Sequence, residues 1–356
     1  MIHYELRPVS ATPRDEGFSQ PAEWSPHRAC WTAWPSHEDL WQDNIHRARE
    51  AFVALVRAIA DVDPATGRAR GETPEVLVAD DANEALAREA LAGVPARLHR
   101  IPFGDIWLRD TAPIFVSRPD GEVAAARFAF NGWGGKYVLD HDDAVSARVA
   151  EASLRRVFSF PWVLEGGSVE PDGEGTILTT TQCLLNRNRN PEMEREEIER
   201  GLREALGARK VLWVTEGLLN DHTDGHIDTI ARFVRPGVVT CMAPRGDDDP
   251  NARVLARIAD ELRAMTDAEG RRLEVIPIPS PGRVLDAEGR VMPASHVNFY
   301  IANTAVVVPV YGTPWDDEVV AAVGALFPTR HAVGVDARAI LSGGGAFHCI
   351  TQQEPA

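Results

Sequence analysis

The order of strand and helix patterns along this chain constrains the fold more than any other feature. Short apolar runs come in pairs, and each pair is followed by one amphipathic helical stretch and one further strand. Two pairs are joined by Pro-Asp-Gly, at residues 119–121 and 171–173, a sequence typical of hairpin turns. A doubly wound sheet would instead show strictly alternating single strands and helices. The pattern therefore predicts one α/β domain made of several similar modules.

The predicted elements fill most of the chain. Residues 1–20 are polar and contain proline, which predicts an N-terminal arm ahead of a single domain over residues 21–356. Neither G-x-G-x-x-G after the first strand nor GxxxxGK[ST] is present, so the sequence does not support nucleotide-phosphate binding. Helices are expected at residues 44–60, 82–92, 192–206, 252–265 and 316–326. Strands are expected at residues 29–35, 76–79, 97–102, 114–116, 124–130, 164–169, 176–180, 210–214, 238–242, 273–276, 297–302, 306–310 and 332–335.

The composition is that of a globular protein from a reducing compartment. The formal net charge of -16 at pH 7 argues against nucleic acid or an anionic membrane as a partner. The cysteines are scattered without a CxxC pair, which fits free thiols better than a disulfide framework. The N-terminus lacks a basic region followed by an apolar run, and no window reaches the length of a membrane span. We therefore expect a cytoplasmic protein that binds neither nucleic acid nor a membrane.

Four polar clusters stand where predicted strands end or turn. They contain Asp110, Glu165, the pair His226 and Asp228, and Cys349, which follows three glycines. Asp110 and Glu165 are 55 residues apart, and Glu165 and His226 are 61 residues apart. His226 and Cys349 are 123 residues apart, which is about two such steps. One polar group per module, all meeting at one centre, is the economical explanation of this spacing.

If these groups meet, their chemistry favours a cationic substrate. A thiolate is a strong nucleophile, and a nearby positive group makes it available. Carboxylates raise the pKa of a thiol unless a cation occupies them. A planar guanidinium suits three carboxylates because its N–H groups pair with them in a fork geometry. The thiolate of Cys349 could attack the guanidinium carbon, while His226 protonates the leaving nitrogen and then activates water.

Each of these residues also has an ordinary structural interpretation. A lone cysteine is most often a small buried hydrophobe. Asp110 can form an ion pair or a helix cap, Glu165 can be a solvated turn residue, and His226 can be a structural histidine. A zinc site is a further alternative, since His222 and His226 are four residues apart with aspartates nearby. The glutamate of an HExxH helix is absent there.

A series of stretches along nearly the whole chain resembles the agmatine deiminase family. This family belongs to the guanidino-group-modifying superfamily, which includes bacterial-type peptidylarginine deiminase. In chain order, the matching stretches are Pro-Ala-Glu-Trp at 21–24 with Trp-Thr-Ala-Trp-Pro at 31–35, Trp-Leu-Arg-Asp-Thr-Ala-Pro at 107–113, Phe-Asn-Gly-Trp-Gly-Gly-Lys-Tyr at 130–137, Leu-Glu-Gly-Gly-Ser at 164–168, residues 183–191, Thr-Asp-Gly-His-Ile-Asp at 223–228, residues 297–303, and residues 343–353.

The resemblance implies a fold, a reaction and a set of roles. The fold would be a five-bladed α/β propeller (pentein-type) of pseudo-symmetric ββαβ modules, with the site at its centre, no metal and no cofactor. The reaction would convert agmatine to N-carbamoylputrescine and ammonia, a step of polyamine synthesis, and a homodimer is expected. The implied roles are Cys349 as nucleophile, forming a covalent thiouronium intermediate, His226 as general acid/base, Asp110 and Asp228 as guanidinium-binding carboxylates, Glu165 as support for His226, and Trp107, Gly344 and Asn298 as substrate contacts.

The chain departs from the family pattern at positions that bear on substrate choice. Ala112 stands where glycine is common, and Ala346-Phe347 stands where Asn-Ile is common. His222 stands where some agmatine deiminases have an acidic residue that can meet the substrate's amine. Three other functions stay open: a deiminase of another guanidino compound or of peptidyl-arginine, a metal-dependent hydrolase that uses His222 and His226, and a non-catalytic guanidinium-binding protein.

Overall fold

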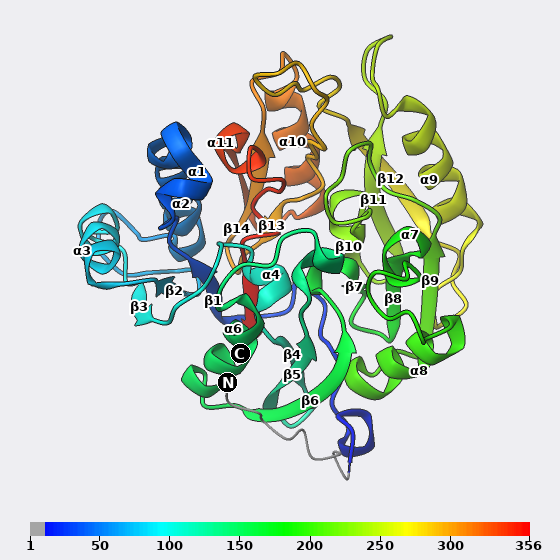
Figure 1. The fold of residues 1–356 in the computed structure, drawn as a ribbon. Helices are drawn as coiled ribbons and strands as arrows, with labels where there is room; N and C mark the ends of the chain where they lie inside the picture. Colours follow the sequence, from blue (N-terminus) through cyan, green and yellow to red (C-terminus); the bar gives the residue numbers. More distant parts are fainter. Residues whose placement is uncertain (1–10) are drawn as a thin grey trace.

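Five small β-sheets follow one another around a common centre in the computed structural model, which describes residues 11–356 (Figure 1). Four sheets contain three strands each, in the orders β4-β5-β6, β7-β8-β9, β10-β11-β12 and β13-β14-β15. The fifth has the order β16-β1-β2-β3. In every sheet the first two strands of this order are antiparallel and the next is parallel. The five-bladed α/β propeller predicted from the sequence is thereby confirmed.

The elements have the following bounds. The strands are β1 His27–Ala33, β2 Thr73–Val78, β3 Arg97–Arg100, β4 Ile114–Ser117, β5 Val123–Ala129, β6 Arg156–Val163, β7 Glu170–Pro171, β8 Thr176–Thr180, β9 Lys210–Val214, β10 Ala231–Arg235, β11 Val238–Ala243, β12 Glu274–Pro279, β13 Tyr300–Ile301, β14 Ala305–Val310, β15 His331–Asp336 and β16 Gln352–Pro355. The helices are α1 Glu38–Trp41, α2 Ile45–Ala60, α3 Asp81–Ala90, α4 Leu108–Thr111, α5 Gly132–Gly135, α6 Asp142–Ala152, α7 Thr181–Leu184, α8 Arg195–Leu206, α9 Ala252–Ala264, α10 Asp316–Leu326 and α11 Arg338–Leu341.

One helix of more than ten residues lies between the antiparallel pair and the parallel strand of each module. These helices are α2, α6, α8, α9 and α10. A parallel strand pair needs such a crossover, because a tight turn cannot join two parallel strands. Both Pro-Asp-Gly sequences lie at the predicted hairpin turns, between β4 and β5 and between β7 and β8. The inner strands are covered on both faces, as in β14, where the first five residues, Ala305 to Pro309, are all buried.

The last strand of the chain closes the ring of sheets. β16 pairs with β1 in antiparallel register, with Gln353 opposite Cys30. The first sheet therefore contains the first and the last strand of the described chain, and Figure 1 shows the red C-terminal strand beside the blue β1. Cys349 lies three residues before β16. Closure of the ring thus holds the segment that carries this cysteine.

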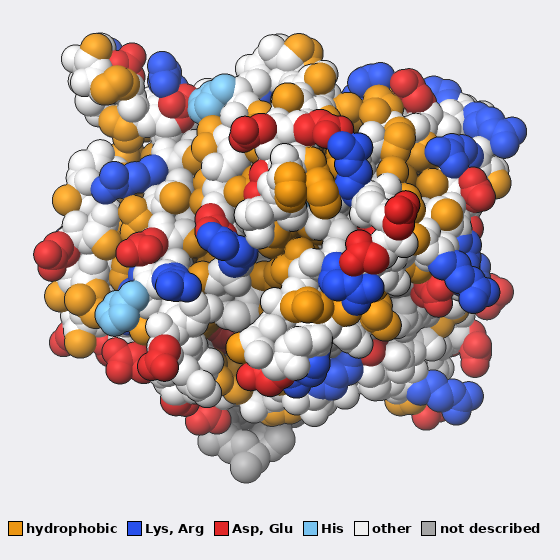
Figure 2. Space-filling view, turned by 90° about the horizontal axis from the view of Figure 1, so that it is seen from above, with side chains coloured by type: hydrophobic (Ala, Val, Ile, Leu, Met, Phe, Trp, Pro, Cys, Tyr) orange, Lys and Arg blue, Asp and Glu red, His pale blue; other side chains and the backbone are white. Residues whose placement is uncertain are grey.

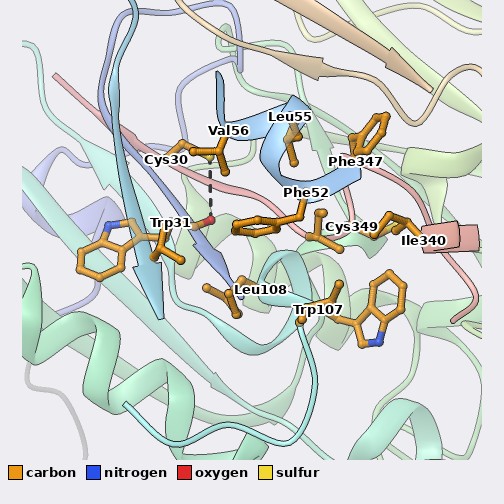
Figure 3. Packing of buried hydrophobic residues seen from close by; sticks show 14 of the residues in the cluster. Cys30, Trp31, Phe52, Leu55, Val56, Trp107, Leu108, Ile340, Phe347 and Cys349 are labelled. Carbon is orange, nitrogen blue, oxygen red and sulfur yellow. Dashed lines mark hydrogen bonds between the residues drawn. The ribbon is translucent and has the colours of Figure 1, made fainter. Parts of the chain in front are cut away.

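The largest apolar core surrounds α2 and reaches the predicted site. It includes Phe52 and Leu55 of α2, and it extends to Trp107, Phe347 and Cys349 (Figure 3). Phe52, Leu55 and Phe347 have essentially no exposed surface. The site is consequently built on a packed core and not on mobile surface loops.

Several local expectations were wrong. Residues 164–169 are not a strand: Gly166–Ser168 form a 3-10 turn (η3), and β7 begins only at Glu170. The patterns did not predict β6, β10, α6 or β16.

Of the expected N-terminal arm, residues 1–10 lie outside the described part, while Phe18 is buried and Ser19 bridges to Ser117. Among the described residues, no helix has the length and apolar character to cross a membrane.

Candidate active site

The structure brings the four predicted polar clusters to one centre. Asp110 is in α4, Glu165 precedes η3, and Asp228 is in the 3-10 turn η4 (Ile227–Thr229) directly after His226. Each of these short turns precedes the hairpin of its sheet, so the ring of modules points them inwards. Gly167 marks their meeting point: a Cβ on it would lie 2.6 Å from Nδ1 of His226, 2.9 Å from Oδ1 of Asp110 and 3.1 Å from Oδ2 of Asp228.

The two aspartates are fixed in different ways. Oδ1 of Asp110 accepts the backbone N–H of Gly167 at 2.9 Å, and its Oδ2 accepts the indole N–H of Trp133 at 2.8 Å. Burial raises the pKa of Asp110 to about 6, and the neighbouring carboxylates add to this effect while His226 opposes it. Oδ2 of Asp228 lies 2.7 Å from the imidazole of His348, whereas its Oδ1 has no hydrogen-bond partner among the described residues.

Cys349 is a thiol beside these carboxylates. Its Sγ lies 3.7 Å from Oδ2 of Asp228, and its backbone N–H donates to Oδ1 of Asn298 at 3.3 Å. Burial, followed by the charges of Asp228 and Asp110, raises the pKa of the thiol well above its ordinary value. The thiolate therefore needs a neighbouring cation, as the sequence argument expected.

His226 is fully buried beside both Asp110 and Glu165. Its Nδ1 lies 3.7 Å from Oδ2 of Asp110. Burial lowers the pKa of His226, but the carboxylate of Asp110, together with Cys183 and Glu165, outweighs this effect and raises the pKa well above its usual value. Glu165 is itself paired, because its Oε1 accepts Nε of Arg189 at 2.7 Å. The free charge at the centre is thus left mainly on Asp110 and Asp228.

A pocket of about 250 Å³ leads from the surface to Cys349 and Asp110. It is lined by Leu40, Asp105, Trp107, Asp110, Trp133, Tyr137, Leu139, His222, Thr223, Ser342, Gly343, Gly344, Gly345 and Cys349. The glycines make room for the ring of Trp107, since a Cβ on Gly343 or on Gly345 would lie 2.7 Å from it. Trp107 and Gly344 thus line the pocket as expected. Asn298 does not: both ends of its amide bind backbone groups at Asp228, His348 and Cys349.

The departures from the family pattern lie in two different places. Ala112, Ala346 and Phe347 are buried and do not line the pocket, so substrate choice does not act through direct contact with them. His222 does line it, stacked on Tyr137 with its Nδ1 3.2 Å from the tyrosine hydroxyl. Of the departures from the family pattern, His222 is therefore the one that lines the pocket.

In the part of the chain that it describes, the structure does not group His222 with His226, the two histidines of the zinc alternative. Among the described residues, His222 and His226 do not belong to one cluster of potential ligands. A group formed by Glu165, Cys183 and His226 does have its donor atoms within 4.8 Å of one another, but Arg189 already engages Glu165. The sequence patterns also missed Glu23, Arg189 and His348, whose contacts with the site run between distant parts of the chain.

Comparison with known proteins agrees with this architecture. The Porphyromonas-type peptidyl-arginine deiminase family matches residues 19–355. The agmatine deiminase of Stutzerimonas stutzeri is 42% identical, with 98% of each chain covered. The structure of the agmatine deiminase of Enterococcus faecalis aligns with a TM-score of 0.90 at 34% identity, covering 98% of this chain and 99% of that one. A cysteine-to-serine variant of C. jejuni agmatine deiminase with substrate bound aligns with a TM-score of 0.84 at 25% identity, covering 95% and 96%.

These matches extend over nearly the whole chain, and they confirm the family to which the sequence motifs pointed. The chain belongs to the agmatine deiminase family and is a hydrolase that acts on the carbon–nitrogen bonds of guanidino compounds.

Proposed function

We propose that this protein hydrolyses agmatine to N-carbamoylputrescine and ammonia through a covalent adduct on Cys349. The observation that carries the proposal is a pocket lined by both Cys349 and Asp110, with His226 and Asp228 grouped beside Asp110 around Gly167. Relatives that are named agmatine deiminases, at up to 42% identity over 98% of the chain, support the same substrate.

The lining of the pocket favours agmatine over arginine. Its walls are largely apolar and include Trp107 and Trp133. Among the described residues that line it, none is lysine or arginine. Lys136, beside the mouth, is held by Asp224 at 2.6 Å and by the carbonyl of His222. The carboxylate of arginine or of a C-terminal arginyl peptide would therefore be desolvated without a cationic partner.

The first half of the reaction starts from a neutral thiol. A guanidinium that pairs with Asp110 and Asp228 neutralises the charges that raise the pKa of Cys349, so the thiol loses its proton to solvent once substrate is bound. Sγ then attacks the guanidinium carbon to give a tetrahedral adduct. His226, which is protonated because of its raised pKa, donates a proton to one nitrogen, and ammonia leaves. An S-alkylthiouronium on Cys349 remains.

The second half reverses these roles. His226 is now neutral and accepts a proton from water as the oxygen attacks the thiouronium carbon. Collapse of this second tetrahedral adduct breaks the C–S bond and expels the thiolate, and loss of the hydroxyl proton to solvent leaves the ureido product. Asp110 and Asp228 hold the planar group in the same place throughout, so each attack meets an oriented carbon.

A substrate panel tests the proposal. We expect ureido product from agmatine, with kcat/KM at least about 100-fold lower for arginine and for C-terminal arginyl peptides. The measurement is ureido colorimetry with ammonia release followed in parallel, before and after metal stripping with EDTA. Equal activity on arginine would contradict the choice of agmatine. Loss of activity on EDTA treatment, restored by added zinc, would favour the metal-dependent alternative.

The pH profile should show an acid limb set by Asp110. The pKa of this group is raised to about 6, and only its ionised form can pair with the guanidinium. As pH falls through about 6, kcat/KM for agmatine should therefore fall about tenfold per unit. His226 has a raised pKa, so the acid that it provides persists through neutral pH. A limb near pH 4, the ordinary range of an aspartate, would show that Asp110 is not the group that titrates.

Two alkylating reagents of similar size should react very differently with Cys349. Chloroacetamidine is a cation, whereas chloroacetamide is neutral, and only the cation can offset Asp110 and Asp228. We expect inactivation by the amidine to be about 100-fold faster, after both rates are divided by those for free glutathione. Saturating agmatine should protect against it. Equal normalised rates would mean that the carboxylates do not control the thiol.

A further inference from the structure

Buried side chains of alternating charge form a hydrogen-bonded network in the centre of the propeller, behind the pocket. His348, the residue before Cys349, places Nδ1 2.7 Å from Oδ2 of Asp228 and Nε2 2.7 Å from Oε2 of Glu23. Glu23 also accepts Nη2 of Arg232 at 2.8 Å, and Arg232 continues to Glu170 at 2.7 Å. His348, Asp228 and Arg232 are fully buried or nearly so, as are both glutamates. This network connects the family motif at Pro21–Trp24 to Asp228 of the site. The proposed reaction had assigned no role to that motif.

The geometry of this network determines how many protons the hydrogen bonds of His348 contain. Each of the two 2.7 Å contacts between nitrogen and oxygen requires one proton. If both carboxylates are ionised, His348 must supply both protons and is an imidazolium. If His348 is neutral, Asp228 or Glu23 must carry a proton, and a protonated Asp228 is a weaker acceptor for a guanidinium.

The surrounding charges favour the ionised carboxylates. Against the effect of burial, Arg232, His348 and Arg109 hold the pKa of Glu23 well below its usual value. Against burial, His348 and then His226 and Arg232 lower the pKa of Asp228. For His348 itself the balance runs the other way, because burial, Arg109 and Arg232 hold its pKa below the ordinary value against the opposing effect of Glu23 and Asp228. The case for an imidazolium therefore rests on the two 2.7 Å contacts with ionised carboxylates. Arg109 is itself held by Gln352 and Gln353 of β16, so the balance of charge depends on ring closure.

We propose that His348 is a positioning residue, which remains doubly protonated between Glu23 and Asp228 and holds Asp228 ionised and oriented towards the substrate's guanidinium. Glu23 supplies the counter-charge that keeps the proton on Nε2. Oδ2 of Asp228 then faces His348 and Cys349, while Oδ1, which has no partner among the described residues, remains available to a guanidinium N–H. This role rests on the proposed deimination, but the protonation state can be measured without turnover.

The first test measures that protonation state directly. Deuterated enzyme labelled with ¹⁵N and ¹³C allows the ring nitrogens of His348 to be assigned through the backbone to Cys349. We expect both nitrogens to carry protons at about pH 8, well above the ordinary histidine pKa of about 6.5. A neutral ring at that pH would overturn the proposal whatever the enzyme's substrate is.

The second test uses His348→Gln, which keeps a hydrogen-bond donor for Asp228 but removes the positive charge. With the positive charge gone, burial is the main influence left on Asp228, so its pKa should rise past that of Asp110, and the acid limb of kcat/KM for agmatine, which Asp110 sets in the unmodified protein, should move to higher pH. His296→Gln is the matched control, because His296 is also buried but binds only the carbonyl of Pro309. Its acid limb should stay where it is in the unmodified protein. An unchanged limb in folded His348→Gln would overturn the proposal. If that variant does not fold, the first test, the nuclear magnetic resonance measurement on labelled enzyme, decides alone.

Discussion

Replacing Cys349 with serine should abolish the release of ureido product from agmatine while leaving agmatine binding intact. A serine hydroxyl has a far higher pKa than a thiol, and the neighbouring carboxylate of Asp228 is too weak a base to remove its proton, so we expect a loss of about 1000-fold or more. Asp110 and Asp228 are unchanged in this variant. Agmatine should therefore still raise the melting temperature, which a thermal shift titration would measure.

Cys241→Ser is the matched control for this variant. Cys241 is also a fully buried free thiol, but it lies in β11 within a different core cluster. Turnover per folded molecule should be preserved there, even if stability falls because a hydroxyl is buried. Normal turnover by Cys349→Ser would remove the basis of the proposed mechanism.

Replacing Gly167 with alanine should have the second largest effect. The added Cβ would come within 3.1 Å of His226, Asp110 and Asp228 at once, closer than such contacts normally are. Gly167 does not have a positive φ, so the substitution tests crowding and not backbone strain. Displacement of these groups by even a fraction of an ångström should lower kcat/KM for agmatine by about 100-fold. Steady-state kinetics with agmatine would measure this.

Gly324→Ala gives the matched control. Gly324 is in α10, away from the pocket, and its added Cβ would meet only Cβ of Ala332 at 3.1 Å. This variant should keep full activity. If Gly167→Ala were equally active, the side chains of His226, Asp110 and Asp228 could not be arranged as closely around that position as the structure has them.

The sequence predicted elements with strong periodicity and missed those stabilised by distant partners. The predicted helix at 316–326 coincides with α10, whereas only two of the eight residues of β6, Phe158 and Val163, are buried. β16 is the clearest case: Gln352–Pro355 is a polar segment, yet all of it is buried. Glu354 is held there by Trp31 and Arg155, and such contacts leave no local signal in the sequence.

The candidate site follows the same division. Asp110, His226, Asp228 and Cys349 were predicted because each stands in a short polar turn at a module boundary. His348 escaped notice although it adjoins Cys349, because its partner Glu23 is 325 residues away. Asn298 was expected to contact substrate, but its amide instead holds the backbone around Cys349. Residues that act on the site from behind it are not marked by spacing along the chain.

The most direct test of the central claim is to trap the covalent intermediate. Enzyme turning over agmatine would be quenched in acid, digested and analysed by mass spectrometry. The account predicts a peptide containing Cys349 that carries agmatine less one ammonia, absent from Cys349→Ser and from enzyme without substrate. Steady turnover of agmatine with Cys349 unmodified at every quench time, and an active Cys349→Ser, would contradict it.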